Sequence, residues 1–500
     1  WRQTSRQASG RIKIAAMPSD LAPLGDLDDG RRNRPYLFYD TAVSICSTCL
    51  RRVEAKVIFE DGLVLLEKWC RVHGRERVLI ADDIPYYRRC REVFLKPPEM
   101  PRRFRTPMRW GCPYDCGLCP DHMQHSCLTL IEVTDHCNLR CPICYASSGP
   151  HRPGFRPLEE IERTLDGIVA NEGAPDVVQI SGGEPTLHPD FWAILDAAKA
   201  RPIKHLMVNT NGIRLANEPD FATRLASYQP GFEIYLQFDS LEAAPLFELR
   251  GADLRDIRAR ALENLNRADV STTLVVTVKR GSNDGELGAI LEFAARQSAV
   301  RGVTFQPIQD AGRTDGYDPA RHRLTLTEVR RRILEQTDLL TPEDLVPVPC
   351  NPDTLAMAYA LKLGDGMLQP LTRFAGDDLL LSGDKSTIVF EKDAELRERF
   401  FRLFSTAPSP EGQAASLQDL LCCLPRVAPN PEIGYRDIFR VLIVQFLDAA
   451  SFDLRAVKKS CVHFAQPDGR SIPFETYNLF YRDERQERLA ELRAEIEGDR

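Results

Sequence analysis

Between residues 128 and 310, short apolar runs alternate with longer stretches in which apolar residues recur every three or four positions. The short runs predict buried strands, and the three-to-four spacing predicts helices with one buried face. The predicted strands are residues 128–133, 177–181, 205–209, 233–238, 272–278 and 302–307. The predicted helices are residues 158–170, 191–200, 220–227, 256–267 and 286–296. Six such alternating units predict an α/β fold with a parallel sheet, in the form of a partial (β/α)6 TIM-type barrel.

Composition and charge narrow the classes of function. The 500 residues include 43% hydrophobic residues, which is enough for a core, and the formal net charge is −7. This charge provides no basic surface for nucleic acid, so we expect no nucleic-acid partner. No window approaches 18 uninterrupted apolar residues, so we expect no transmembrane segment. Residues 1–35 begin with a polar, Arg-rich stretch and are expected to form a flexible lead-in.

The 15 cysteines are clustered, with eleven before residue 145 and four after residue 349. This clustering favours metal binding in a reducing cytosol over disulfides. Cys137, Cys141 and Cys144 follow the first predicted strand with the spacing C-x3-C-x2-C, and Tyr145 comes directly after them. Three thiolates bind three irons of a [4Fe–4S] cluster and leave the fourth iron open for chemistry. The alternative is a zinc knuckle, but zinc knuckles usually pair two C-x2-C hooks.

A second motif follows the second predicted strand. It consists of Ser181, Gly182, Gly183, Glu184 and Pro185. Paired glycines at a strand end allow the backbone to approach a ligand closely, and Glu184 can accept from a ligand ammonium group. The alternative is an ordinary strand-to-helix turn. Together the two motifs resemble the radical SAM superfamily.

This resemblance implies that S-adenosylmethionine (SAM) binds the open iron and that the Ser181–Glu184 motif holds its amino group. It also implies a 5′-deoxyadenosyl radical that abstracts hydrogen from unactivated carbons, with reduced ferredoxin or flavodoxin as electron donor. A multi-cluster electron-transfer protein is the hypothesis from another class, but such a carrier has no need for the glycine motif.

Polar residues lie at the carboxyl ends of the other predicted strands, the edge where barrel enzymes place their chemistry. They are Asn209, Asn211, Gln237, Asp239, Thr277, Lys279 and Gln306. We expect part of this set to contact SAM or the substrate. The alternative for each residue is a cap or a turn.

Two further groups of cysteines precede the barrel. Cys46, Cys49, Cys70 and His73 form C-x2-C and C-x2-H hooks around a hairpin, a pattern typical of a mononuclear tetrahedral Fe or Zn site. Cys90 is the alternative to His73 as the fourth ligand. Cys112, Cys116 and Cys119 repeat the C-x3-C-x2-C spacing and are expected to hold an auxiliary [4Fe–4S] cluster, with Cys90 or Cys127 as fourth ligand. We assign the SAM cluster to the later triplet because it follows a strand and ends in an aromatic residue.

The order of these motifs, including the run GCPYDCGLCP, resembles the archaeal tetraether lipid synthase family and its bacterial relatives over about residues 40–480. This resemblance implies a lipid substrate at the membrane surface, whose two hydrocarbon tails are coupled through a carbon–carbon bond. We therefore expect a cytoplasmic enzyme that contacts the membrane peripherally. The alternative is a radical SAM C-methylase acting on a pterin or another small molecule, because relatives with similar motifs are credited with that activity.

The same resemblance implies a second auxiliary cluster in the C-terminal region. Its expected ligands are Cys350 and Cys461 with one or both of Cys422 and Cys423. Relatives are expected to carry a cysteine where this chain has Glu475, so the ligand set stays open.

The predicted domain boundaries follow from these groups. They are 1–35 for the lead-in, 36–100 for a rubredoxin- or zinc-ribbon-like metal domain, 101–127 for the auxiliary-cluster segment, 128–312 for the barrel and 313–500 for an α+β cluster-binding extension.

Overall fold

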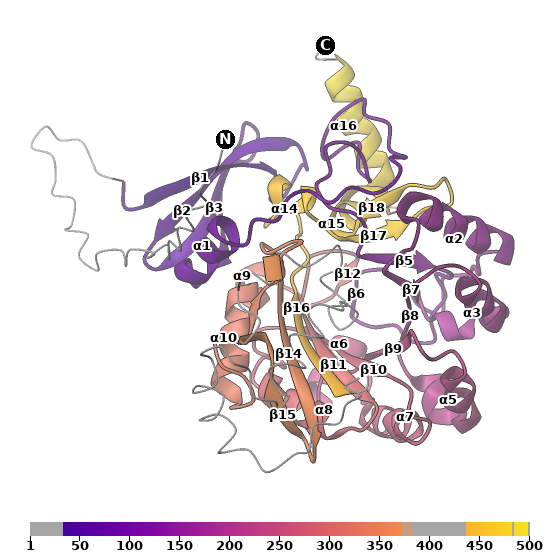
Figure 1. Cartoon of the computed structure of the whole chain (residues 1–500). Helices are drawn as coiled ribbons and strands as arrows, with labels where there is room; N and C mark the ends of the chain where they lie inside the picture. Colours follow the sequence, from indigo (N-terminus) through magenta and orange to yellow (C-terminus); the bar gives the residue numbers. More distant parts are fainter. Residues whose placement is uncertain (1–33, 374–376, 378–379, 382–436, 483–484, 499–500) are drawn as a thin grey trace, which may run out of the picture.

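The protein is built around one large curved sheet with helices on its outer side (Figure 1). The computed structural model describes residues 34–498 apart from 374–376, 378–379, 382–436 and 483–484. Neighbouring strands of the sheet run parallel in the spatial order β17-β5-β7-β8-β9-β10-β11-β16. These strands are β5 (Leu128–Glu132), β7 (Val177–Ser181), β8 (His205–Thr210), β9 (Phe232–Gln237), β10 (Thr272–Val278), β11 (Val300–Pro307), β16 (Ile438–Val444) and β17 (Val462–Ala465).

Helices cover the outer face of this sheet because each of them has one apolar side to bury. They are α2 (Leu158–Glu172), α3 (Phe191–Lys199), α4 (Ile213–Asn217), α5 (Pro219–Ala226), α6 (Ala243–Arg250), α7 (Arg255–Arg267), α8 (Leu287–Arg296) and α10 (Leu326–Gln336). The six predicted strands and five predicted helices are present, with ends shifted by at most two residues. Helices α4 and α6, of 5 and 8 residues, were not predicted. The predicted partial barrel is confirmed.

Strands from the C-terminal region join both edges of the barrel sheet. β16 pairs with β11, and β17 pairs with β5. Antiparallel strands then continue the sheet: β13 (Val346–Pro347), β14 (Leu355–Gly364) and β15 (Met367–Pro370) on one side, and β18 (Ser471–Pro473) on the other. The predicted boundary at residue 312 therefore divides strands that share one sheet. Local patterns cannot reveal such pairing, because the partners are more than 130 residues apart.

A buried network of charged and polar side chains connects β16 to other strands of the barrel. Arg440 on β16 donates from Nη2 to both carboxylate oxygens of Glu233 on β9, at 3.0 and 2.7 Å. The ring of His205 on β8 lies 3.0 Å from the same carboxylate, which Thr273 on β10 also contacts. Burial would raise the pKa of Glu233, but Arg440 and His205 hold it well below its usual range.

The N-terminal region forms a separate four-stranded antiparallel sheet. It consists of β1 (Leu37–Ile45), β2 (Arg52–Glu60), β3 (Leu63–Cys70) and β4 (Gly74–Ala81), followed by helix α1 (Ile84–Glu92). Lys68 on β3 fixes this sheet to the C-terminal part of the chain, because its buried ammonium donates to the carbonyls of Ile45, Ala449 and Ala450.

The remaining described elements are short, apart from the last helix. They are β6 (Ile143–Cys144), the 3-10 turn Pro185–Leu187, β12 (Arg313–Thr314), α9 (Pro319–His322), α14 (Leu454–Lys458), α15 (Phe474–Thr476), the π-helical turn Tyr477–Tyr481 and α16 (Gln486–Gly498).

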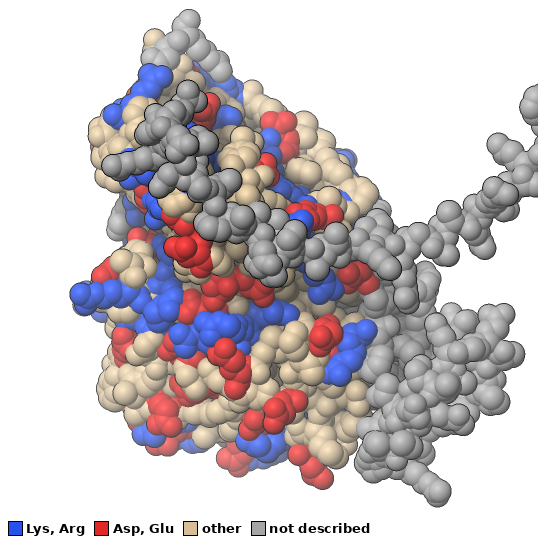
Figure 2. All heavy atoms as spheres, turned by 90° about the vertical axis from the view of Figure 1, so that its left-hand side faces the viewer, with Lys and Arg blue, Asp and Glu red and all other residues tan. Residues whose placement is uncertain are grey.

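The surface has a mixed charge on the face seen in Figure 2, where basic and acidic side chains lie next to one another between uncharged areas. On α10, for example, Arg331 pairs with Glu335, and Arg332 pairs with Glu328. No helix in the described part of the chain is long and apolar enough to span a membrane.

Candidate active site

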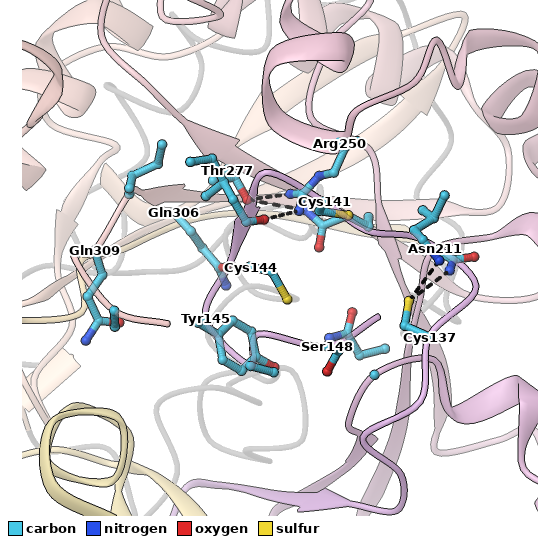
Figure 3. Close-up of a pocket in the computed structure, with 18 of the residues that line it drawn as sticks. Cys137, Cys141, Cys144, Tyr145, Ser148, Asn211, Arg250, Thr277, Gln306 and Gln309 are labelled. Carbon is cyan, nitrogen blue, oxygen red and sulfur yellow. Dashed lines mark hydrogen bonds between the residues drawn. The ribbon is translucent and has the colours of Figure 1, made fainter. Parts of the chain in front are cut away.

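The Cys137 triplet and the glycine motif line one pocket at the carboxyl ends of the barrel strands (Figure 3). Cys137, Cys141 and Cys144 lie on the loop after β5, and all three contribute to the wall. The pocket holds about 1030 Å³ of empty space including its open mouth. Burial raises the pKa of the Cys137 thiol to about 12. Three convergent thiols in a pocket of this size fit a three-ligand cluster with a bound cofactor.

The two glycines of the second motif are required by close backbone packing. A Cβ atom on Gly182 would lie 2.3 Å from the carbonyl oxygen of Thr134, and one on Gly183 would lie 2.2 Å from that of His136. Gly182 also has a φ of 131°, which L side chains rarely adopt. Because neither glycine has a side chain, the loop after β7 packs directly against the backbone of the cysteine loop. No side chain from these two positions fills the pocket beside it.

Glu184 lies behind this wall and does not line the pocket. Its carboxylate accepts from the backbone N–H groups of Thr186 and Asn211, at 3.1 and 2.7 Å, and from the Thr210 hydroxyl at 2.8 Å. Burial nevertheless raises its pKa, and the Asn211 N–H opposes that shift. In this arrangement Glu184 joins the β7 loop to the β8 loop. Its predicted contact with a ligand amino group stays a prediction.

The other residues predicted to bind the cofactor divide into two groups. The pocket is lined by Tyr145, Gly182, Gly183, Asn209, Asn211, Gln237, Thr277 and Gln306. Ser181 and Asp239 are buried outside the lining, as is Lys279, whose ammonium pairs with Glu248. Ser181 supports the wall, because its hydroxyl lies 3.4 Å from both the Tyr145 hydroxyl and the Asn209 amide.

Asp239 holds the guanidinium group of Arg250 beside the cysteines. Its carboxylate accepts from Arg250 Nε and Nη2 at 2.7 and 2.6 Å, and Arg250 also donates to Thr277 Oγ1 at 2.8 Å. Burial would raise the pKa of Asp239, but Arg250 keeps it below its usual range. The guanidinium lies against Cys141 and lowers the pKa of that thiol, against the larger upward effect of burial. Arg250 therefore favours the thiolate form that a metal cluster needs.

A second arginine in the wall has unsatisfied donors. Arg258 is buried, and its Nη1 donates to the carbonyl of Asn211, whereas Nε and Nη2 have no partner among the described residues. Burial lowers its pKa to about 10. A buried cation with two unused N–H groups fits a ligand that brings an anionic group. The sequence analysis missed Arg250 and Arg258, because they lie on α6 and α7 without a recognisable spacing.

Aromatic side chains, two of them from the C-terminal region of the chain, form part of the pocket wall. Phe446 and Phe474, both in the lining, stack with ring centroids 3.7 Å apart, and Tyr145 lies 5.2 Å from Phe474. These phenylalanines were also missed, since single aromatic residues in a distant segment carry no local signal. They add apolar surface to the pocket that the cysteines line.

The N-terminal sheet brings together the predicted mononuclear site. The ligand atoms of Cys46, Cys49, Cys70 and His73 all lie within 4.8 Å of one another. Cys49 Sγ is 3.8 Å from Cys70 Sγ, close to the roughly 3.8 Å separation expected around one tetrahedral ion with metal–sulfur bonds of about 2.3 Å. Burial would raise the pKa of Cys70, but the backbone N–H groups of His73 and Val72 lower it to about 6, which favours a thiolate. Cys90 is not part of this group.

The Cys112 triplet connects the N-terminal sheet to the C-terminal region. Tyr114 inside the triplet accepts from the N–H of Arg52 and donates to the carbonyl of Leu50. The N–H of Cys116 donates to the Tyr481 hydroxyl at 2.8 Å, and that of Leu118 to the carbonyl of Ser471 at 2.9 Å. The three sulfurs are not among the compact groups within the described residues.

A third group of cysteines forms from three remote segments. The sulfurs of Cys127, Cys350 and Cys461 lie within 4.8 Å of one another, and all three residues are buried. The Cys350 and Cys461 thiols, together with the ring of His125 at 3.6 Å, lower the pKa of Cys127 far below its usual value. Cys350 and Cys461 had been predicted as partners of Cys422 and Cys423, which lie outside the described residues. Cys127 had been considered only for the Cys112 triplet.

Two other candidates for metal ligands have ordinary surroundings. Cys90 on α1 packs in the apolar core with Tyr86, and burial raises its pKa far above the usual value. Glu475 is buried and accepts from the Ser460 hydroxyl at 2.9 Å, and burial raises its pKa to about 7. Neither belongs to a compact metal-binding group in the described part of the chain.

Comparisons with known proteins define the class first. Residues 131–294 match the radical SAM superfamily, and residues 38–82 match the HMPTM N-terminal zinc ribbon domain. Together with the three-cysteine pocket, the first match identifies a radical SAM enzyme.

The chain is also 31% identical over 487 residues to the 7,8-dihydro-6-hydroxymethylpterin dimethyltransferase of Methanocaldococcus jannaschii, across 90% of this chain and 95% of the relative. It therefore belongs to the family of that protein.

More distant similarities are confined to part of the chain. Mycofactocin maturase MftC of Mycobacterium tuberculosis is 33% identical over 178 residues, or 36% of this chain and 44% of the relative. The crystal structure of Streptococcus suis SuiB bound to S-adenosylmethionine superposes with a TM-score of 0.35 at 19% identity, over 42% of this chain and 47% of that one. The similarity to the pterin dimethyltransferase over 90% of this chain fits the pterin alternative of the sequence analysis better than the coupling of lipid tails.

Proposed function

We propose that the protein is a radical SAM C-methyltransferase whose substrate is a pterin-type heterocycle. The observation that supports the substrate is the similarity over 95% of the length of a pterin dimethyltransferase. The observation that supports the chemistry is the pocket that three cysteines and the two glycines of the second motif line together. When bound, a [4Fe–4S] cluster with SAM supplies a radical that removes hydrogen from a carbon.

Each group of pocket residues has a separate role in this proposal. Cys137, Cys141 and Cys144 hold the cluster, and Arg250 favours the thiolate form of Cys141. The two glycines leave room for the methionine part of SAM, and Arg258 offers its unused N–H groups to the carboxylate. Phe446, Phe474 and Tyr145 provide flat apolar surfaces against which an aromatic heterocycle can stack. They also exclude water from the reacting carbon.

We propose two auxiliary sites in addition to the pocket. Cys112, Cys116 and Cys119 are proposed to hold an auxiliary cluster, and Cys127, Cys350 and Cys461 a further metal centre. The methyl group must come from a second SAM molecule or another methyl donor, and electrons must come from a reductant such as reduced ferredoxin or flavodoxin.

The proposed substrate is tested by product analysis. The reconstituted protein is incubated under anaerobic conditions with SAM, a strong reductant and 7,8-dihydro-6-hydroxymethylpterin. We expect mass spectrometry to detect a pterin that has gained one or two CH2 units. An unchanged pterin, together with coupled tails of doubled length in lipids extracted from an expression host, contradicts the pterin proposal and favours the lipid interpretation.

The N-terminal site gives a separate prediction. Changing Cys49 to Ser removes one thiolate of a four-ligand site, and we expect the loss of about one metal ion per chain, zinc in view of the zinc-ribbon match. Metal analysis of the purified protein measures this loss. Cys90→Ser is the matched control and should retain the ion. Equal zinc contents in both variants would show that the four residues do not bind it.

A further inference from the structure

A second hollow, lined by several arginines, lies beside the pocket that contains Cys137, Cys141 and Cys144, which we call the SAM pocket. We name it the arginine recess, and it holds about 620 Å³ of empty space including its mouth. Four arginines contribute to its lining: Arg152, Arg156, Arg482 and Arg485. Among the described lining residues the carboxylates are those of Glu132 and Asp135, so these six side chains carry a formal charge of about +2 at neutral pH.

The arginine recess and the SAM pocket share a wall. Ala146 lines both hollows, and it follows Cys144 and Tyr145 directly. Gly312 packs closely against this segment, since a Cβ atom on it would lie 2.3 Å from the carbonyl oxygen of Tyr145. Phe474 in the SAM pocket and Tyr477 in the recess lie three residues apart. The two hollows are therefore adjacent.

Arg482 is held rigidly at the base of the recess. Its guanidinium donates to Glu132 Oε1 at 2.7 Å and lies 5.0 Å from the centre of the Tyr477 ring and 5.4 Å from that of Tyr145. Burial would lower its pKa, but Glu132 raises it above the usual range, so the charge persists. A fixed cation of this kind loses little entropy when it binds an anion.

Arg156 and Arg485 have spare capacity among the described residues. Arg156 forms one ion pair there, with Glu160 at 3.8 Å, and both side chains are partly exposed. Arg485 is exposed and forms no salt bridge within the described part of the chain. Guanidinium groups gathered around one concave site suit phosphate in particular, because its several oxygens accept paired N–H donors.

We propose that the arginine recess binds a phosphate group carried by the substrate, while the carbon to be modified lies in the SAM pocket. This inference rests on the proposed function for the position of the reacting carbon. It names a phosphate ester as the substrate class, whether the phosphate belongs to a pterin or to a lipid headgroup.

The test measures binding to the cluster-reconstituted full chain by equilibrium dialysis. The probes are 7,8-dihydro-6-hydroxymethylpterin and its monophosphate ester, and dihexanoylglycerol and dihexanoyl phosphatidic acid. We expect one phosphate ester to bind at least about tenfold more tightly than its neutral parent. Tighter binding of the pterin ester identifies a pterin source. If only the phospholipid binds more tightly than its neutral parent, the result supports the arginine recess as a phosphate site but contradicts the pterin substrate.

Variants connect the effect to the recess. Arg485→Ala and Arg156→Ala should each lose about tenfold in affinity for the ester and leave the neutral parent unchanged, and Arg485→Lys should recover part of the loss. Arg321→Ala, whose side chain is exposed outside the recess, is the control and should match the unmodified protein. Iron content and the unfolding midpoint are measured for each variant. Equal affinity of the unmodified protein for esters and parents, or no effect of Arg485→Ala on ester binding, would overturn the proposal.

Discussion

Changing Cys137, Cys141 and Cys144 to alanine is expected to abolish the formation of 5′-deoxyadenosine from SAM. The same change of Cys112, Cys116 and Cys119 is expected to leave this reaction detectable. The two triplets are expected to differ because they lie in different parts of the fold. Only the first triplet lines the pocket that also contains the glycine motif, Asn211 and Arg258. The second lies between the N-terminal sheet and the C-terminal region, where Cys116 contacts Tyr481.

The measurement is anaerobic, with SAM and a strong reductant, and 5′-deoxyadenosine is quantified by liquid chromatography. Iron and sulfide analysis accompanies each variant, and each triple change should remove about four irons. A Cys90→Ala variant controls for the loss of an unrelated buried cysteine. If the Cys112 variant is inactive while retaining its other clusters, and the Cys137 variant is active, the two triplets have been assigned in reverse.

The second large effect concerns stability. Changing Glu233 to Ala leaves the guanidinium of Arg440 buried without its carboxylate, and we expect the free energy of unfolding to fall by about 3–5 kcal/mol. A urea titration followed by circular dichroism measures this change. Adding Arg440→Met should recover part of the loss, because the uncompensated charge is removed. Glu263→Ala on the exposed face of α7 is the control and should change stability by less than about 0.5 kcal/mol.

The same network predicts that the free energy of unfolding depends on pH. The pKa of Glu233 is lower in the folded protein than its ordinary value of 4.5. The carboxylate therefore stabilises the fold at pH values above about 4.5, and this contribution is lost as the pH falls below that value. The stability difference between the unmodified protein and Glu233→Ala should shrink in acid. A difference that stays constant from pH 7 to pH 3 would contradict the role given to Arg440.

Local patterns predicted the barrel well because each β/α unit buries its own apolar face. The alternation of short runs and amphipathic stretches fixed six strands to within two residues. The motif spacing likewise predicted which cysteines would share a pocket. Both properties depend on neighbours within about 40 residues of one another.

What could not be predicted depends on distant segments. Arg250 and Arg258 become parts of the pocket only because α6 and α7 pack beneath the strand ends. Cys127 meets Cys350 and Cys461 only after β17 has paired with β5. Glu184 illustrates another limit, since a carboxylate in a binding motif can be fully engaged by the protein itself.

The pairing of β17 with β5 has a consequence for synthesis in the cell. β5 is among the first barrel strands to leave the ribosome, yet its outer edge is completed by residues 462–464, more than 300 positions later. During that interval the edge displays unpaired N–H and C=O groups, which invite wrong partners. Contacts of such long range also form slowly. The nascent chain therefore needs protection until β17 has been translated, and the cluster of Cys127, Cys350 and Cys461 can form only after that point.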